Sequence, residues 1–325
     1  MQGKVVAVTG GSGFIGTHLL TALLADADIT EIYVLDAVPP RLEHPKIKFI
    51  TCDIRKSIAF VPPAPIHCCF HLAAVCREPG FDWDEYFQTN YQGTRVVCEW
   101  ASKSNINNLV FTSTAMVFRA GEERNSEESL PNADSAYGIS KALAEEVLRG
   151  WQSANSGRRL RIVRPGVVFG KNGGGNFSRL FSALRRRMFF YIGRDSTVKS
   201  AIYVKDLVRL LQVVASDSQP YWVYHGVYPQ PTTVRSICAA FCETYSWKRS
   251  VLTLPYRPAL LAALFFQMLD AAGLKNPIHY RRIQKLYQST NLSAERLKAI
   301  EFELKYSLAD AISDWRRDCR QGELI

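Results

Sequence analysis

The sequence of 325 residues contains no apolar run long enough to cross a membrane, which argues against an integral membrane protein. The most apolar stretch, Ala259 to Leu269, falls well short of the ~20 residues that a spanning helix needs, and Asp270 follows it directly. The first apolar segment begins already at Val5, so we expect no signal peptide. A cytoplasmic location is therefore expected.

The sequence also lacks the cysteine and histidine spacings of a metal site. None of the eight cysteines forms a Cys-x-x-Cys pair, and the six histidines do not cluster. Cys68 and Cys69 fall inside an apolar run, and Cys238 and Cys242 share one face of an expected helix. We interpret the cysteines as reduced, apolar core residues and expect no metal.

No nucleic-acid-binding motif accompanies the net charge of +10. Part of this charge is local, because Arg185–Arg187 precede Met188–Phe190 and a second basic group spans 158–161. Such charge suits nucleic acid, an anionic membrane or an anionic substrate. In the absence of a motif we expect a solvated basic surface and a phosphate-bearing substrate, with no nucleic acid as partner.

The stretch from Val5 to Leu20 carries the most informative pattern in the chain. A short apolar run leads into Gly10, Gly13 and Gly16, and an amphipathic segment follows at once. Gly10 allows a sharp turn off a strand, Gly13 allows the backbone to approach a pyrophosphate, and Gly16 allows a helix to pack close to the strand. Phosphates would then bind the N–H groups at the start of that helix.

A second β-rich run, Glu31–Leu35, ends in Asp36, which lies 20 residues beyond Gly16. Dinucleotide-binding folds place at this point an acid that accepts hydrogen bonds from the adenosine ribose. Its carboxylate would repel a 2′-phosphate, so the sequence favours NAD over NADP. The alternative is a glycine turn followed by an acid through chance.

Strand-like apolar runs alternate with helical patterns over the first two thirds of the chain. Strands are expected at 47–54, 67–74 and 109–114, and a helix at 86–103. This alternation predicts an α/β fold with a doubly wound parallel sheet of the Rossmann type. The last third shows only helical patterns, at 234–245, 258–274, 293–300 and 308–315.

Tyr137 and Lys141 lie four residues apart at the start of a strong helix-forming segment, on the same helical face. An ammonium group beside a phenol lowers the pKa of that phenol towards the working pH. Such a tyrosine can exchange a proton with a hydroxyl or carbonyl oxygen while hydride moves at the adjacent carbon. The same lysine can hold the nicotinamide ribose.

In this combination the sequence resembles the extended short-chain dehydrogenase/reductases, which include NAD-dependent nucleotide-sugar epimerases, dehydratases and reductases and the 3β-hydroxysteroid dehydrogenase type. The resemblance covers nearly the whole chain, from the Thr9–Gly16 turn to Ile202–Asp206, which resembles the return to the sheet after the substrate segment. It implies a Rossmann domain at 1–170, with 200–228 returning to it. A smaller, mainly helical substrate-binding lid would comprise 171–199 and 229–325.

The resemblance also implies the cofactor contacts. Asp53 and Ile54 resemble the pair at the adenine, His71–Ala74 the strand end that lines the cofactor, Asn90 part of the helix that braces the site, and 164–166 the loop at the nicotinamide. The expected NAD-binding residues are Gly10, Gly13, Phe14, Ile15, Gly16, Asp36, Asp53, Ile54, Leu72, Ala73, Ala74, Asn90, Tyr137, Lys141 and Pro165.

The resemblance places the catalytic hydroxyl at Thr114, with Ser113 as the fallback, beside Tyr137 and Lys141. In sugar 4,6-dehydratases the hydroxyl residue is followed by Asp-Glu, whereas here residues 115–116 are Ala and Met, which argues against a dehydratase. Substrate contacts are implied for Asn176, at the start of the nucleotide-sugar region, and for Lys199, where related enzymes often carry an Arg for the diphosphate.

The implied activity is that of an NAD-dependent nucleotide-sugar epimerase of the UDP-hexose 4-epimerase type, working by transient hydride transfer through a keto-sugar. Its substrate would be a UDP-hexose or a UDP-N-acetylhexosamine, and a homodimer is expected by analogy. A keto-sugar reductase, a 3β-hydroxysteroid-type alcohol dehydrogenase and a non-catalytic NAD-sensing regulator remain as alternatives. Residues 259–269 are expected to pack in the core under the lid, and a helix lying on a membrane surface beside Arg185–Arg187 is the alternative.

Overall fold

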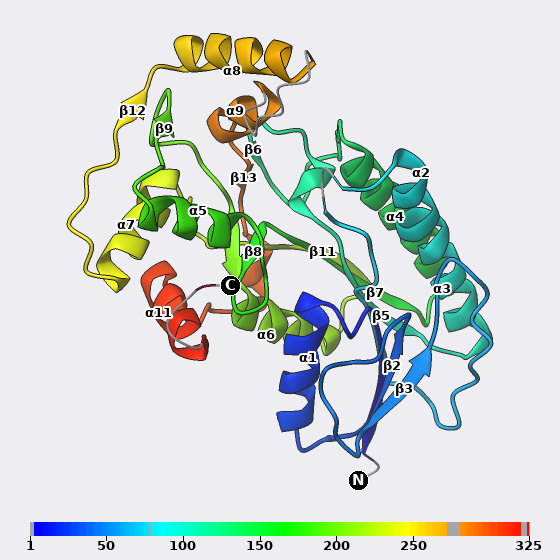
Figure 1. Cartoon of the computed structure of the whole chain (residues 1–325). Helices are drawn as coiled ribbons and strands as arrows, with labels where there is room; N and C mark the ends of the chain where they lie inside the picture. Colours follow the sequence, from blue (N-terminus) through cyan, green and yellow to red (C-terminus); the bar gives the residue numbers. More distant parts are fainter. Residues whose placement is uncertain (1–2, 78–79, 272–279, 320–323, 325) are drawn as a thin grey trace.

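The computed structural model describes residues 3–77, 80–271, 280–319 and 324 (Figure 1). Its centre is a seven-stranded sheet of order β11-β7-β5-β4-β1-β2-β3, in which every neighbouring pair is parallel. This order confirms the predicted Rossmann-type fold. The strands are β1 (Lys4–Thr9), β2 (Ile29–Asp36), β3 (Ile47–Thr51), β4 (Cys68–His71), β5 (Asn108–Thr112), β7 (Arg159–Pro165) and β11 (Tyr221–Gly226).

Two hydrophobic cores cover the two faces of the sheet. Alternate side chains of β1 enter different cores, Val6 and Val8 the first, Val5 and Ala7 the second. Helices α1 (Phe14–Ala25) and α6 (Val204–Ala215) contribute to the first core, and α3 (Gly93–Lys103) and α4 (Ala136–Ser153) to the second. The strands are therefore buried on both faces, and their carboxyl ends meet at one edge.

The helix predicted at 86–103 is longer and less regular than expected. It begins as α2 (Trp83–Tyr86), continues as a single π-helical segment, η1 (Phe87–Gln92), and ends as α3. π-helical turns inside α-helices occur often at functional sites. Here the irregular segment carries Asn90 towards α4, which packs against it.

A third hydrophobic core joins the elements outside the sheet. Phe181, Phe241 and Trp315 lie in it, from α5 (Asn176–Arg185), α7 (Val234–Thr244) and α11 (Leu308–Asp318). Short parallel strand pairs connect these elements to the rest of the chain. The pairs are β8 (Val167–Phe169) with β10 (Ala201–Tyr203), β9 (Tyr191–Ile192) with β12 (Thr253–Leu254), and β6 (Arg124–Asn125) with β13 (Asn291–Leu292).

The helices expected at 234–245 and 308–315 are α7 and α11, whereas the one expected at 293–300 is only the single turn α10 (Arg296–Ala299). Helix α9 (Tyr280–Tyr287) was not predicted. The helix expected at 258–274 is α8 (Tyr256–Ala271), and its last three predicted residues lie outside the described part of the chain. The prediction that this helix packs in the core is wrong, because its large apolar side chains Leu261, Leu264 and Phe265 are exposed.

None of the helices in the described segments is both long enough and apolar enough to span a membrane.

Helix α4 approaches the end of β5 closely because of a glycine. A Cβ atom at Gly138 would collide with the backbone carbonyl oxygen of Met116, which belongs to the 3₁₀ turn η2 (Ala115–Val117). Gly150, in the last turns of the same helix, has no atom within 4 Å of the position that a Cβ would take. The two glycines of α4 therefore differ in the space that a new methyl group would find.

We expect Gly138→Ala to destabilise the protein, because backbone must move to accept the new methyl group. Gly150→Ala, the matched control, should raise the free energy of unfolding by ~0.5–1 kcal/mol, since alanine is the better helix former. Urea unfolding of both variants measures the difference. Equal effects of the two substitutions would contradict the close approach of α4 to η2.

Two histidines at the carboxyl ends of strands are buried and neutral. Burial lowers the pKa of His71, in β4, and that of His225, in β11, to about 3. Between pH 6.5 and 3 the unfolded chain therefore binds protons at these side chains that the folded chain does not. Stability is then complete above pH 6.5 and declines as the pH falls.

Unfolding free energy measured by urea at pH 6.5 to 4 should fall by up to ~1.4 kcal/mol per pH unit for each buried histidine. His71→Gln removes one of the two protons and should make the slope shallower. His44→Gln changes a histidine that is exposed and should leave the slope as it is. A slope that does not respond to His71→Gln would contradict this assignment.

Candidate active site

The glycine turn between β1 and α1 is tightly packed. Gly10 has a φ of +71°, and a Cβ there would lie 2.5 Å from the backbone nitrogen of Ala73. A Cβ at Gly16 would collide with the backbone of the same turn. The segment Leu72–Ala74 thus lies against the turn, and both follow the carboxyl ends of strands, β4 and β1 respectively.

The turn and the end of β2 together fit a dinucleotide. Asp36 accepts a hydrogen bond from the Ser12 backbone nitrogen at 3.0 Å, so its carboxylate lies beside the turn. Gly13 precedes α1 without a side-chain cap, and the first-turn N–H groups at Phe14 and Ile15 have no partner within the helix. These donors and the helix dipole suit a pyrophosphate, and Asp36 suits an adjacent ribose.

The two residues expected at the adenine, Asp53 and Ile54, have different surroundings from each other. Asp53 forms an ion pair with Arg55 at 2.8 Å, and the hydrogen bonds from Arg55 lower the pKa of its carboxyl group. Ile54 is buried against Gly93, the first residue of α3. The Asp53 carboxylate is thus committed to an ion pair, and an adenine contact for either residue stays a prediction.

Tyr137 and Lys141 stand on the buried side of the first turns of α4. Ser135 caps the helix by accepting a hydrogen bond from the Gly138 backbone nitrogen at 3.2 Å. Tyr137 packs with Tyr86 and Met116. The Lys141 ammonium lies 3.9 Å from the centroid of the Phe111 ring, and burial lowers its pKa to about 7.

Behind this pair lies an ion pair that the sequence analysis missed. Glu145, one turn after Lys141, accepts hydrogen bonds from the Arg164 guanidinium at 2.6 and 3.0 Å, and both side chains are buried. The Ser113 hydroxyl donates to the same carboxylate at 2.5 Å. A sequence signal existed, because residues 137, 141 and 145 repeat at helical spacing and the third is an acid on a buried face.

The hydroxyl groups of Ser113 and Thr114 therefore differ in whether their protons are already used in a hydrogen bond. The Ser113 proton is used in the bond to Glu145. Thr114 instead accepts a hydrogen bond from the Met116 backbone nitrogen at 3.1 Å, which leaves its own proton for another acceptor. Thr114 also lies at the start of η2, the turn that α4 contacts. This geometry favours Thr114 over Ser113 as the hydroxyl that meets a substrate.

A chain of hydrogen bonds connects the glycine turn with α4. The His71 ring lies between the hydroxyls of Thr9, at 2.7 Å, and Thr94, at 3.0 Å. The Thr94 hydroxyl donates to the Asn90 backbone oxygen. The Asn90 amide in turn donates to the Ser140 hydroxyl at 3.0 Å, next to Lys141 along the helix. Asn90 thus braces α4, a placement consistent with its expected role.

The two predicted substrate residues have different surroundings. Asn176 is exposed at the first residue of α5. Lys199 donates through its ammonium nitrogen to the backbone oxygens of Lys285 and Gln288, at the end of α9, both at 2.6 Å. Burial lowers the pKa of Lys199 to about 8. These bonds use two of its three donors, and a diphosphate contact stays a prediction.

Pro165 is buried at the end of β7, and the loop 171–175 reaches back over α1. In that loop a Cβ at Gly173 would lie 3.0 Å from the ring of Phe14, and the Lys171 backbone oxygen is 3.0 Å from Nε2 of His18. The expected substrate segment therefore begins directly above the helix that would hold the pyrophosphate.

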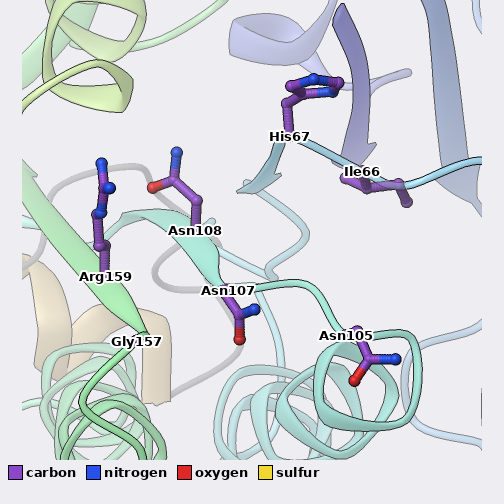
Figure 2. A pocket seen from close by; sticks show the side chains of 7 residues that line it. All are labelled: Ile66, His67, Asn105, Asn107, Asn108, Gly157 and Arg159. Atoms are coloured by element: carbon purple, nitrogen blue, oxygen red, sulfur yellow. The ribbon is translucent and has the colours of Figure 1, made fainter.

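One hollow lies at the opposite edge of the sheet, at the amino ends of the strands. Figure 2 shows its side chains spread along the strand ends rather than converging on one point. The lining residues are Ile66, His67, Asn105, Asn107, Asn108, Gly157 and Arg159. In doubly wound folds ligands bind at the carboxyl ends of strands, so this hollow is not the expected site. Among the described residues no three His, Cys, Asp or Glu side chains converge as metal ligands.

Comparison with known proteins identifies the family. The NAD dependent epimerase/dehydratase family matches residues 6–224. The chain is 29% identical to the N-acetyl-alpha-D-glucosaminyl-diphospho-ditrans,octacis-undecaprenol 4-epimerase of Escherichia coli O157:H7, over 94% of this chain and 92% of that protein. It is 28% identical to a 3-beta-hydroxysteroid dehydrogenase of Mycolicibacterium neoaurum, over 62% of this chain and 58% of that protein.

Two solved structures share the fold over nearly their whole length. MoeE5 in complex with UDP-glucuronic acid and NAD has a TM-score of 0.74 at 21% identity, covering 97% of this chain and 99% of that one. A UDP-galactose 4-epimerase has a TM-score of 0.71 at 19% identity, covering 98% and 97%. With a family match over 219 of 325 residues (6–224), the chain belongs to the NAD-dependent epimerase/dehydratase family and is an NAD-dependent enzyme of the extended short-chain dehydrogenase/reductase type.

Proposed function

We propose that this enzyme is a 4-epimerase of a hexose or N-acetylhexosamine carried on a diphosphate. One observation carries the proposal: α4 brings Tyr137 and Lys141 against the turn that begins at Thr114. In that turn Ala115 and Met116 have no group that could transfer a proton. The site therefore holds the parts for moving a proton at one hydroxyl and none for eliminating water.

In the proposed reaction the glycine turn and Asp36 would hold NAD, which when bound would supply the acceptor of the hydride and its later donor. The Tyr137 side chain, as the phenolate, takes the proton from the sugar hydroxyl and, as the phenol, later returns it. The Lys141 ammonium, when protonated, stabilises the phenolate. Thr114 donates its hydrogen bond to the reacting oxygen, and rotation of the keto-sugar between the two transfers inverts the carbon.

The carrier of the sugar is the second part of the proposal. A nucleoside diphosphate is the expectation from the family resemblance. A polyprenyl diphosphate is favoured by the match to the undecaprenol-linked 4-epimerase, because that match extends over nearly the whole of both chains and so includes the lid. Both carriers present a diphosphate, for which Lys199 and the start of α5 remain the candidate contacts.

Purified enzyme incubated with UDP-glucose, UDP-N-acetylglucosamine or a short-chain polyprenyl-diphosphate N-acetylglucosamine tests the reaction. We expect the 4-epimer to appear, as detected by chromatography or NMR, while the NADH absorbance shows no net change. If all three compounds are unchanged and an added alcohol is oxidised with one NADH per product, the enzyme is a dehydrogenase and the proposal is wrong.

Tyr137→Phe should retain NAD and lose turnover by a factor of ~10² or more, because the ring stays and only the proton-transferring hydroxyl is removed. The NAD content of the purified variant, read from its absorbance, controls for binding. Tyr86→Phe offers a matched control, since Tyr86 lies beside Tyr137 but donates its hydroxyl to the Arg77 backbone oxygen. Equal losses in the two variants would contradict the assignment of Tyr137.

Thr114→Val and Ser113→Ala separate the two hydroxyls. Thr114→Val should lower kcat by ~10²-fold or more, because it removes a donor to the reacting oxygen. It should also cost ~0.5–2 kcal/mol of stability, since the Met116 backbone nitrogen loses its acceptor. Ser113→Ala should instead act mainly on stability, at a cost of ~1–3 kcal/mol, since the buried Glu145 carboxylate loses a donor. Steady-state kinetics and urea unfolding distinguish the two effects, and the reverse pattern would assign catalysis to Ser113.

A further inference from the structure

The outward face of α8 is apolar and has no cover within the described chain. Leu261, Leu264 and Phe265 share this face and are 68, 42 and 59% exposed. The opposite face, which carries the buried Ala263, packs on α9. A helix that is apolar all round is normally buried all round, so the outward half of α8 is suited to an apolar contact outside the chain.

The apolar area extends beyond α8 onto neighbouring elements. Strand β12 leads directly into α8 and pairs with β9, and α9 packs against both α8 and β9. Of the fifteen exposed large apolar side chains in the described chain, five lie on these elements and three lie on the segments that lead into β9 and β12. We call this group the α8 surface; it comprises Met188, Phe190, Leu252, Leu254, Leu261, Leu264, Phe265 and Leu286. Figure 1 shows α8 at the periphery, beyond α9 and far from the sheet.

The segments that form the α8 surface carry an excess of basic residues, with Asp270 of α8 as an acid among them. Residues 177–194, 244–269 and 280–287 contain no aspartate or glutamate. Their basic residues with described side chains are Arg179, Arg185, Arg186, Arg187, Arg194, Lys248, Arg249, Arg257 and Lys285, of which Arg194 pairs with Glu122. Arg186 and Arg187 are exposed directly before Met188. An apolar surface is thus bordered mainly by positive charge.

We propose that the α8 surface docks on the face of an anionic lipid bilayer. A bilayer offers both things that this surface matches, hydrocarbon for the apolar side chains and negative headgroups for the border of arginines and lysines. A second copy of the chain matches only the first, because two copies facing each other here would bring their basic segments together. Charge complementarity therefore selects the membrane.

The docking surface is joined to the candidate diphosphate residue. Tyr256 of α8 stacks on Tyr287 of α9, with ring centroids 4.2 Å apart. At this same end of α9, Lys199 donates to the carbonyls of Lys285 and Gln288. The lid would thus face the bilayer, and Lys199, the candidate contact for the diphosphate, would lie next to the docked elements. Resting on the proposed function, this arrangement selects a sugar diphosphate whose carrier is a lipid embedded in the membrane.

Flotation of the full-length protein with phosphatidylcholine vesicles, with and without phosphatidylglycerol, tests the docking. We expect binding that requires the anionic lipid. The double variant Leu261→Glu with Phe265→Glu should lower the vesicle partition by at least ~10-fold, because it places charge in the apolar layer. Val61→Glu, in the proline-rich loop 61–65, changes a side chain that is 80% exposed elsewhere and should bind as the wild type does.

A second double variant tests the attraction between the basic residues and the anionic headgroups. Arg186→Ser with Arg187→Ser should weaken binding to anionic vesicles by about fivefold per charge removed, and raising the salt concentration should act in the same direction. We expect an unchanged melting temperature in all variants, since none of these side chains is in a core or in the catalytic set. This measurement shows that the fold is intact.

Three results would overturn the inference. They are wild-type protein that does not float with anionic vesicles, flotation that survives Leu261→Glu with Phe265→Glu, and a dimer in solution that this double variant dissociates in the absence of vesicle binding. The last result would assign the α8 surface to a second copy. Flotation is read without turnover, so a failed epimerase assay beside intact flotation would reject the proposed function alone.

Discussion

The buried ion pair between Glu145 and Arg164 is the interaction on which the geometry of the site depends. A charge taken out of water costs several kcal/mol unless it is paired and hydrogen-bonded, and here the carboxylate receives two N–H bonds and the Ser113 hydroxyl. Glu145 belongs to α4 and Arg164 to β7, while Ser113 follows β5. The pair therefore holds the helix that carries Tyr137 and Lys141 in one place on the sheet.

A second polar connection runs along the edge of the sheet from the other side. The hydrogen bonds through His71 and Asn90 join β1, which precedes the glycine turn, to α4. All of these groups are buried, so each bond broken would leave an unpaired polar atom. The half of the site that fits NAD and the half that would handle the sugar hydroxyl are thus parts of one network, and neither can shift without the other.

The elements outside the sheet are organised by a different principle. Helices α5, α7 and α11 share an aromatic core with Phe181, Phe241 and Trp315, which fixes them by apolar burial. Helix α8 lies outside that core and is held through α9 and a two-residue strand pair. Outside the aromatic core lies the part of these elements whose surface is apolar and rich in basic residues, as a membrane-contacting element requires.

Local patterns in the sequence determined the fold class, the glycine turn, Asp36 and the Tyr137–Lys141 pair, because strand periodicity, backbone permissiveness and helical spacing each act over a few residues. Tertiary structure decided what depends on partners distant in the chain. It committed Ser113 to Glu145, placed Lys199 on α9 and left the apolar side chains of α8 exposed. Composition alone could not distinguish a buried apolar helix from an exposed one, because the two differ only in whether the rest of the chain supplies a covering surface.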